Sequence, residues 1–167
     1  MQEAGTGAAN HIAEMDNRYL TFWTQSQLFG IPIADVVQIV GMQPITSIPE
    51  FPVFAKGVMN LRGSIIPVID VRLRFGKEEQ VYNERTCIVV TLINQKQVGF
   101  IVDEVDEVAY ISREDIAEPP LVAKEKSNAY LMGVAKQADK IILLLDTAKV
   151  LSQETLTTLA QQGQEGE

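Results

Sequence analysis

The chain has 167 residues, of which 46% are hydrophobic, and 22 acidic against 14 basic residues give it a formal net charge of −8. This length suffices for one domain or two closely packed small ones, and no apolar run approaches the roughly 20 residues of a membrane-spanning helix. The acidic balance opposes attraction to phosphate backbones and anionic lipid, so we expect neither nucleic-acid binding nor direct membrane insertion. Residues 1–16 show no secretory leader, which predicts a cytoplasmic protein.

The first half of the chain predicts short strands separated by turns. Aromatic and β-branched residues, which suit a half-buried pleated surface, recur in blocks bounded by turn-forming residues. We expect strands at residues 19–24, 28–33, 38–43, 57–61 and 64–70. Three prolines favour an exposed loop at 44–52, and Arg62 and Gly63 form the tip of the last hairpin. One helical turn at 71–75 and a charged linker at 77–85 follow.

The second half predicts a similar order of elements. Strands are expected at residues 86–92, 97–102, 106–111, 130–135 and 140–146. Ser112 is placed to cap a helical start near Asp115. Leucines at helical spacing predict a helix from residue 147, and we assign its end and a frayed tail to 152–167. Residues 1–17 predict a flexible N-terminal tail.

The two halves are copies of one pattern. Aligning them pairs Gly30 with Gly99, Gly57 with Gly133, and Asp70 with Asp146, with the apolar positions in register. A repeat of roughly 70 residues has the size of a small domain rather than of a solenoid unit. We therefore predict an all-β fold of two small barrels or sandwiches, with subdomains at 18–80 and 81–151 between which strands can be exchanged, and a crevice between them.

No pattern of catalytic residues is found. His11, the only histidine, lies in the predicted tail, and Cys87 lies in an apolar strand, where a small filler is favoured over a reactive thiol. Asp70 and Asp146 stand at equivalent strand ends, which indicates a structural role such as capping a helical turn. The acidic run at 103–107 lacks the ligand spacing of a calcium loop and predicts a solvated turn. We expect no enzyme activity, no cofactor and no metal.

Arg62 differs from its surroundings because its counterpart in the second repeat is Ala138. The fold therefore does not demand arginine at this turn, and a use in binding competes with a tolerated surface charge. Lys56, Arg72 and Arg74 lie nearby in sequence and could form a basic area that orients an acidic partner. Val36 and its counterpart Val105 are either core residues or an exposed ridge beside the crevice.

The segment Gly57-Val-Met-Asn-Leu-Arg-Gly-Ser-Ile-Ile-Pro-Val-Ile-Asp70 closely resembles the CheW family of bacterial chemotaxis coupling proteins, and further pieces follow the family's order from about Arg18 to Leu151. The resemblance implies two SH3-like five-stranded β-barrels with short helical turns, and a non-catalytic adaptor. Its implied partners are the cytoplasmic tips of chemoreceptors (methyl-accepting chemotaxis proteins) and the regulatory domain of the histidine kinase CheA, in arrays at the inner membrane.

The resemblance also implies site residues. Receptor contact would use a groove between the barrels, formed by Val36, Gln38, Arg62, Val105 and Val108, with Gly57, Gly99 and Gly133 shaping nearby turns. Kinase docking would use the regions of Ile33, Gly41 and Val68. Family members often carry Glu in place of Gln38, which leaves open whether this position pairs with arginine. Two alternatives are a regulatory-domain-like binding module of another two-component system and a small-ligand-binding barrel.

Overall fold

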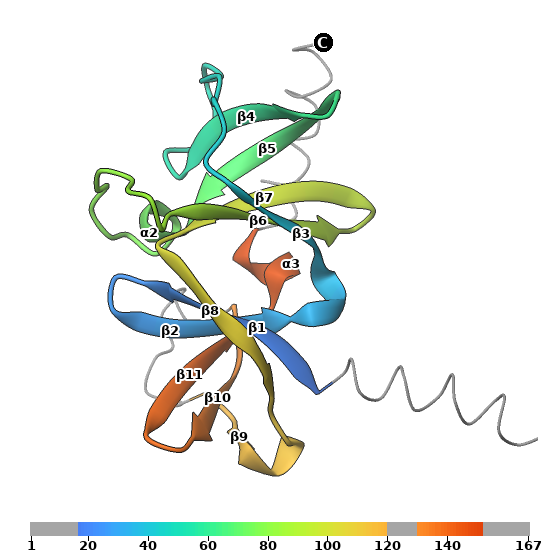
Figure 1. Ribbon diagram of the computed structural model, residues 1–167, viewed down its shortest axis with the longest axis vertical. Coiled ribbons are helices and arrows are strands. Elements are labelled where there is room, and N and C mark those ends of the chain that lie inside the picture. The colour runs from blue at the N-terminus through green and yellow to red at the C-terminus, as the bar shows by residue number, and fades with distance from the viewer. Residues whose placement is uncertain (1–16, 120–129, 152–167) are drawn as a thin grey trace, which may run out of the picture.

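The computed structural model, which describes residues 17–119 and 130–151, consists of two β-sheets packed against each other (Figure 1). The central sheet lies between residues 36 and 102 in the chain and has the strand order β3-β6-β7-β5-β4. The terminal sheet contains the first and the last strands, in the order β8-β1-β2-β11-β10-β9. The all-β class predicted from the sequence is confirmed.

The strands are short, as expected from the spacing of the turn residues. The central sheet contains β3 (Val36–Gly41), β4 (Ala55–Leu61), β5 (Ser64–Asp70), β6 (Cys87–Ile93) and β7 (Lys96–Val102). The terminal sheet contains β1 (Arg18–Thr24), β2 (Gln27–Pro32), β8 (Glu104–Tyr110), β9 (Ile116–Ala117), β10 (Leu131–Gln137) and β11 (Lys140–Leu145). Short helical turns connect them: η1 (Ile33–Asp35), α2 (Val71–Arg74), η2 (Arg113–Asp115) and α3 (Thr147–Val150).

The sheets exchange strands between the two repeats. β1 and β2 pair with β8 and β11 of the second repeat, while β6 and β7 pair with β3 and β5 of the first. Each sheet therefore contains strands from both of the contiguous stretches 18–80 and 81–151. Alternating apolar residues specify which face of a strand is buried but not which strand lies beside it.

The repeat is preserved in the register of the sheets. Val68 of β5 lies opposite Gly99 of β7 in a parallel pair. The equivalent Leu144 of β11 lies opposite Gly30 of β2, also in a parallel pair. Each sheet is thus built to the same plan, although its strands come from both copies.

Each sheet curls until an extension of its first strand meets its last one. Thr46, beyond the end of β3, exchanges two backbone hydrogen bonds of 2.8 and 2.9 Å with Val58 of β4. In the terminal sheet Ala117 of β9 lies opposite Val134, the equivalent of Val58. The expected loop at 44–52 is therefore not simply exposed, because part of it closes the central sheet in the manner of a small barrel.

A glycine stands where each closing segment crosses. Gly57 has φ +144°, and a Cβ atom there would lie 2.0 Å from the carbonyl oxygen of Thr46. A Cβ atom on Gly133 would lie 2.6 Å from the Ile116 side chain and 3.0 Å from the Ala117 carbonyl oxygen. Contacts under 3.0 Å essentially never occur at real Cβ atoms, so a side chain at Gly57 would push the closing segment away, and one at Gly133 would force the Ile116 side chain to move.

The apolar residues form three packed clusters. One lies in the terminal sheet and includes Tyr19, Leu28, Ala109, Ile111, Ala135, Ile142 and Leu144. A second lies in the central sheet and includes Met59, Ile66, Val68, Ile88, Val90 and Ile101. The third and largest draws on both sheets, and we call it the inter-sheet core. Strands such as β7 serve two clusters at once because successive side chains point to opposite faces.

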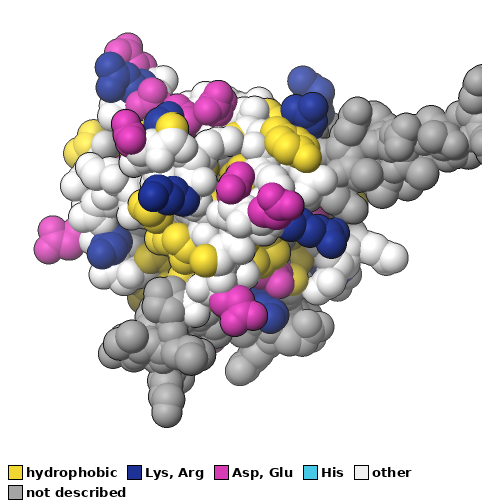
Figure 2. Space-filling view, turned by 90° about the horizontal axis from the view of Figure 1, so that it is seen from below, with side chains coloured by type: hydrophobic (Ala, Val, Ile, Leu, Met, Phe, Trp, Pro, Cys, Tyr) yellow, Lys and Arg dark blue, Asp and Glu magenta, His cyan; other side chains and the backbone are white. Residues whose placement is uncertain are grey.

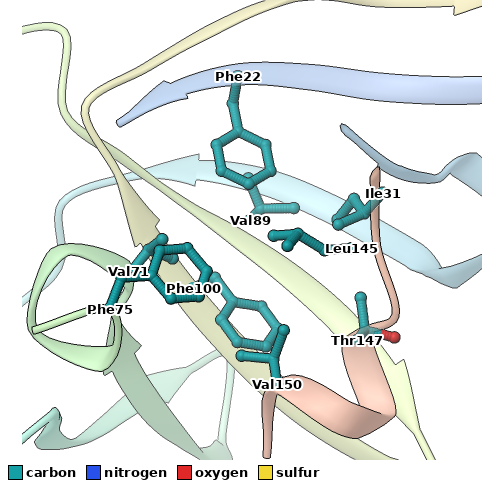
Figure 3. Close-up of a pocket in the computed structure, with 9 residues that line it drawn as sticks. All are labelled: Phe22, Ile31, Val71, Phe75, Val89, Phe100, Leu145, Thr147 and Val150. Atoms are coloured by element: carbon teal, nitrogen blue, oxygen red, sulfur yellow. The ribbon is translucent and has the colours of Figure 1, made fainter. Parts of the chain in front are cut away.

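The inter-sheet core packs the described parts of the two sheets closely together. Figure 3 shows Phe22 and Ile31 from the terminal sheet converging with Val89 and Phe100 from the central sheet. Only about 10 Å³ of space remains among them, and its lining is almost wholly apolar. A void of this size and polarity does not hold an ordered water. The sheets are therefore fixed in their mutual orientation by close packing.

Asp70 and Asp146 perform the structural role predicted for them. The Asp70 carboxylate accepts hydrogen bonds from the backbone N–H groups two and three residues on, at 2.9 and 3.4 Å. The Asp146 carboxylate does the same at 3.1 and 3.3 Å. These bonds satisfy amides that a helical turn leaves without partners. Ser112 likewise accepts from the amide of Glu114, one residue earlier than expected.

In the described residues no helix is long and apolar enough to cross a membrane. The helix predicted from residue 147 begins as α3. Its expected continuation at 152–167 lies outside the described residues, as does all but the last residue of the predicted tail at 1–17.

Candidate functional site

β3 and β8 are equivalent strands of the two repeats, and both cross the near face of the molecule in Figure 1. Val36 opens β3, and its counterpart Val105 is the second residue of β8. Both side chains are half-buried and pack against the inter-sheet core. Val36 and Val105 were predicted to be either core residues or an exposed ridge, and each is partly both: it packs on the core and exposes the rest of its surface to solvent.

Other apolar side chains of β3 and β8 are exposed to solvent. Val108 of β8 is 47% exposed, and Val37 and Ile39 of β3 are exposed to a similar extent. The apolar residues of β8 are interspersed with acidic residues, which discourage this strand from pairing with another chain. Exposed apolar residues with a polar rim are typical of surfaces that bind other proteins.

Arg62 lies exposed at the tip of the β4–β5 hairpin with φ +54°. Ala138, at the same place in the β10–β11 hairpin, also has φ +54°, so the backbone conformation does not require arginine. The Asn60 side chain accepts a 2.9 Å hydrogen bond from Gly63 and holds the turn without help from Arg62. The Arg62 side chain makes no ion pair or side-chain hydrogen bond with the described residues, Gln38 included.

The expected receptor residues occupy two places rather than one. Val36, Val105 and Val108 lie on the two strands that flank the sheet junction, with Gln38 half-buried on β3. The hairpin that carries Arg62 extends away from β8, toward the top of Figure 1. The hollows found beside the inter-sheet core are lined by other residues.

The basic area suggested by the sequence does not form. Arg72 makes a two-pronged ion pair with Asp103, and Lys56 pairs with Glu79. The Arg74 guanidinium lies over the rings of Phe54 and Tyr130 at 5.1 and 5.5 Å. Spacing along the sequence placed these cations near one another, but each is already engaged within the fold.

The glycines lie within strands and not in turns as the resemblance implied. Gly57 and Gly133 are at register shifts in β4 and β10, where the closing segments cross. Gly99 lies in β7, where a Cβ atom would be 2.7 Å from the Ile88 side chain. All three are buried, so their role in the structure is close packing of the backbone.

Among the residues expected to face the kinase, Val68 is 0% exposed and belongs to the core of the central sheet. The Val68 side chain therefore has no surface to offer a partner in the folded protein, and only the region around it could contact one. Ile33 is half-buried in η1, and Gly41 is exposed at the end of β3. Only these two present surface to a partner.

Two titratable groups near the β3 and β8 strands have raised pKa values. Burial raises the pKa of the Asp35 carboxyl, a hydrogen bond from the Thr147 hydroxyl lowers it, and the negative charge of Asp146 raises it again. Burial also raises the pKa of the Cys87 thiol, a backbone hydrogen bond at Val105 lowers it, and Glu104 raises it. A raised thiol pKa leaves less of the reactive thiolate, as expected for a filler cysteine.

Asp103 has a larger role than the solvated turn predicted for it. Besides pairing with Arg72, its carboxylate accepts a 2.8 Å hydrogen bond from the amide of Gln25, in the β1–β2 turn. It thereby connects the terminal sheet to α2, which lies between β5 and β6 of the central sheet in the chain. The partners lie 31 and 78 residues away along the chain, so no local sequence signal could reveal them.

A row of packed aromatic rings was also not predicted from the sequence. Phe22, Phe29, Phe75 and Tyr130 follow one another with ring-centroid separations of 5.9, 5.2 and 4.8 Å. The row begins in β1 and β2, passes through the residue after α2, and ends just before β10. Aromatic content at each position was visible in the sequence, but the row depends on the strand exchange.

Figure 2 views the molecule from below, over the terminal sheet. Basic and acidic side chains are interspersed on this face, with apolar side chains gathered between them. No large area of a single charge covers it. Such a surface suits recognition of a protein more than of a polyanion.

Comparison with known proteins places this arrangement in a family. The model of the CheW-like domain matches residues 18–155, which includes every described strand. The chain belongs to the CheW family. The resemblance recognised in the sequence is thereby confirmed.

Relatives in this family align along almost their whole length. The chain is 34% identical to the chemotaxis protein CheW of Klebsiella aerogenes over 155 residues, covering 92% of this chain and 93% of that protein. It is 27% identical to the protein FrzA of Myxococcus xanthus over 141 residues, covering 83% and 88%. Among solved structures, the scaffolding protein TtCheW of Thermoanaerobacter tengcongensis superposes with a TM-score of 0.73 at 38% identity, covering 79% of this chain and 90% of that one.

Proposed function

We propose that this protein is a non-catalytic chemotaxis adaptor that couples the cytoplasmic tips of chemoreceptors to the regulatory domain of the histidine kinase CheA. Membership of the CheW family, together with the scaffolding role named for the similar TtCheW structure, is the observation that carries the proposal. The adaptor would work in the cytoplasm, within receptor arrays at the inner membrane. It needs no cofactor for this role.

The geometry supports binding rather than catalysis. The two repeated aspartates, Asp70 and Asp146, accept hydrogen bonds that cap helical turns. Burial raises the pKa of the Cys87 thiol, which leaves less of the reactive thiolate. The exposed residues of β3 and β8, and Arg62, which has no ion pair with the described residues, offer contacts to a partner, and among themselves they form no set of acid, base and nucleophile.

The coupling would depend on two faces of one packed body. In our proposal the receptor tip contacts β3, β8 and the Arg62 hairpin, with the three glycines keeping the strands beneath in place. The kinase domain contacts the region of Ile33 and the Gly41 end of β3, supported from below by Val68. Because the inter-sheet core fixes the sheets, binding both partners raises their effective concentration and sets their orientation.

The test is pairwise binding of the full chain to a purified receptor cytoplasmic fragment and to the CheA regulatory domain. Binding of both is the expected result. Binding of neither would overturn the proposal. Binding of a regulatory domain from another two-component system, with no affinity for the receptor fragment, would favour the alternative module.

A further inference from the structure

We propose that Arg72 and Asp103 are positioning residues for the receptor surface, because their ion pair fixes the register in which β8 lies on the terminal sheet. The proposal rests on the proposed function, in which Val105 and Val108 of β8 contact the receptor tip. Arg72 lies in α2 and Asp103 directly precedes β8, so the pair holds the start of the strand that makes this contact. β8 begins beside α2 and crosses in front of β1 and β2 (Figure 1).

The sequence of β8 does not specify its own register. Valines recur at every third residue, at Val102, Val105 and Val108, with two acidic residues between successive valines. Because a strand points every second side chain to the same face, a spacing of three does not define which residues face the core. The strand accommodates this spacing with a bulge: β8 pairs with β1 at Val105 and again at Glu107, and Asp106 is left between them. Contacts other than the valines must therefore fix where the bulge lies.

Asp103 is held from both sheets at the point where the chain passes from one to the other. It stands between β7 of the central sheet and β8 of the terminal sheet. Its carboxylate accepts hydrogen bonds from Nε of Arg72 at 2.7 Å, from Nη2 of Arg72, and from the Gln25 amide at 2.8 Å. Its own amide donates a 3.0 Å hydrogen bond to the Trp23 carbonyl oxygen. Only two residues of β8 separate this fixed point from the bulge.

Arg72 is itself held in place by the start of α2. Its backbone amide donates a 2.9 Å hydrogen bond to the capping carboxylate of Asp70, and its side chain is only 12% exposed. Nη1 of its guanidinium is buried and has no hydrogen-bond partner among the described residues. A buried charge pair with an unsatisfied nitrogen contributes little net stability, and setting a register is the best-attested use of such pairs.

The other repeat shows that the fold does not require this pair. In the alignment of the two repeats, Ala34 corresponds to Asp103. Ala148 likewise corresponds to Arg72. Ala34 lies in η1, where the chain crosses from β2 to β3, and this crossing is linked to α3 by a 3.1 Å hydrogen bond from the Thr147 hydroxyl to a carboxylate of η1. The charged pair therefore belongs to β8 in particular and not to the repeated plan.

The test compares Arg72→Met with the unmodified full chain, because methionine keeps an apolar stem and removes the donors. In the free protein, hydrogen exchange of the β8 amides that pair with β1 should become about tenfold faster, while exchange in β3 changes less than about twofold. Affinity for the receptor fragment should fall about fivefold, as expected if about one fifth of the molecules keep the competent register. Affinity for the CheA regulatory domain should change less than about twofold, and the thermal midpoint should move by less than about 4 °C.

Two further variants complete the comparison. Lys56→Met removes the ion pair with Glu79, which involves no residue of β8, and it should change neither β8 exchange nor receptor affinity. Asp103→Asn keeps the size of the side chain and removes its charge, so it should change β8 exchange and receptor affinity in the same direction as Arg72→Met. Since Asp103 is the more exposed member of the pair, this variant keeps the test decisive if Arg72→Met does not fold.

The proposal is overturned if β8 exchanges at the same rate in the variants as in the unmodified chain. It is also overturned if affinity for the receptor fragment and for the kinase domain falls equally, because that result indicates general destabilisation. Exchange is measured without a partner, so it tests the register of β8 separately from the adaptor function. Failure of the unmodified chain to bind the receptor fragment would overturn the proposed function and the receptor role of the pair, and the exchange rates would still decide whether Arg72 and Asp103 fix the register.

Discussion

Arg62 sits in a left-handed backbone conformation that costs an ordinary residue roughly 1 kcal/mol or more, and its side chain gains no ion pair or hydrogen bond with the described residues in return. Its counterpart Ala138 adopts the same conformation without a functional side chain. An exposed arginine with no ion pair or side-chain hydrogen bond to the described residues is a natural candidate for contact with a partner.

Arg62→Ala makes the two hairpins alike and tests this role. We expect the free energy of unfolding to change by less than about 0.5 kcal/mol, because the side chain is exposed and no ion pair or side-chain hydrogen bond to the described residues is lost. Affinity for the receptor fragment should fall about tenfold, as for a moderate interface residue. Denaturant unfolding and a binding titration measure the two effects. Unchanged receptor affinity in a natively stable variant would remove Arg62 from the interface.

Gly57 shows the opposite case, a residue whose importance lies in the fold. A methyl group there would lie 2.0 Å from the Thr46 carbonyl oxygen. We expect Gly57→Ala to lower the free energy of unfolding by about 3 kcal/mol or more, since the segment that closes the sheet must move. Gly41→Ala is the control, because a Cβ atom there meets nothing within 4 Å. Equal stability of the two variants would refute this explanation.

Asp35 provides a prediction about pH. Because its pKa is raised above the ordinary 3.8, the folded state holds the proton more tightly than the unfolded state. Stability therefore falls as the pH rises from near 3.8 through the folded pKa. Asp35→Asn should be more stable than the unmodified chain at pH 7, by less than about 1 kcal/mol, and equally stable at pH 3. Thermal melts at the two pH values measure this, and a variant less stable at pH 7 would contradict it.

The elements show what a sequence can and cannot specify. Strand positions, the four tight hairpins of the described residues and the aspartate caps follow from local patterns, and the structure places them within a few residues of expectation. The alignment of the two repeats pairs Gly57 with Gly133, and the two glycines do occupy equivalent places in the sheets. The segments that pass over them, at Thr46 and Ala117, could not be predicted from the sequence. The strand exchange, the Arg72–Asp103 pair and the aromatic row depend on residues far apart in the chain, for which alternation of side chains carries no information.

For the candidate site, the sequence identified individual residues better than their surroundings. Local patterning indicated that Val36 and Val105 were either core or ridge, and they are partly both. The apolar strand at 64–70 indicated that Val68 is buried, as it is, but nothing local indicated that Arg74 lies over two aromatic rings. This burial depends on how the two sheets pack, and that packing depends on which strands pair with one another.

The two aspartate caps allow a comparison between equivalent elements. Asp70 is buried and also accepts a 2.7 Å hydrogen bond from the Tyr82 hydroxyl, whereas Asp146 is more exposed. We expect Asp146→Ala to cost about 1 kcal/mol of unfolding free energy, the usual value for a cap, and Asp70→Ala about 2 kcal/mol or more. Urea denaturation of both variants checks the order. A larger loss for Asp146→Ala would show that burial and Tyr82 add nothing to the cap.

At the scale of the whole molecule, strand exchange makes the two sheets one unit. Neither sheet contains a complete set of strands from a single repeat, and the inter-sheet core takes side chains from both. A displacement of one sheet would therefore disturb the packing of the other. This rigidity is what an adaptor needs if it is to hold two partners at a fixed angle.

The most direct test of this account is the affinity of the CheA regulatory domain for the chain, measured by calorimetry in the absence and in the presence of saturating receptor fragment. The account predicts that the kinase domain binds equally tightly or more tightly when the receptor face is occupied, and that all three proteins co-elute as one complex. Displacement of the kinase domain by the receptor fragment would contradict it, because the two partners would then compete for one surface.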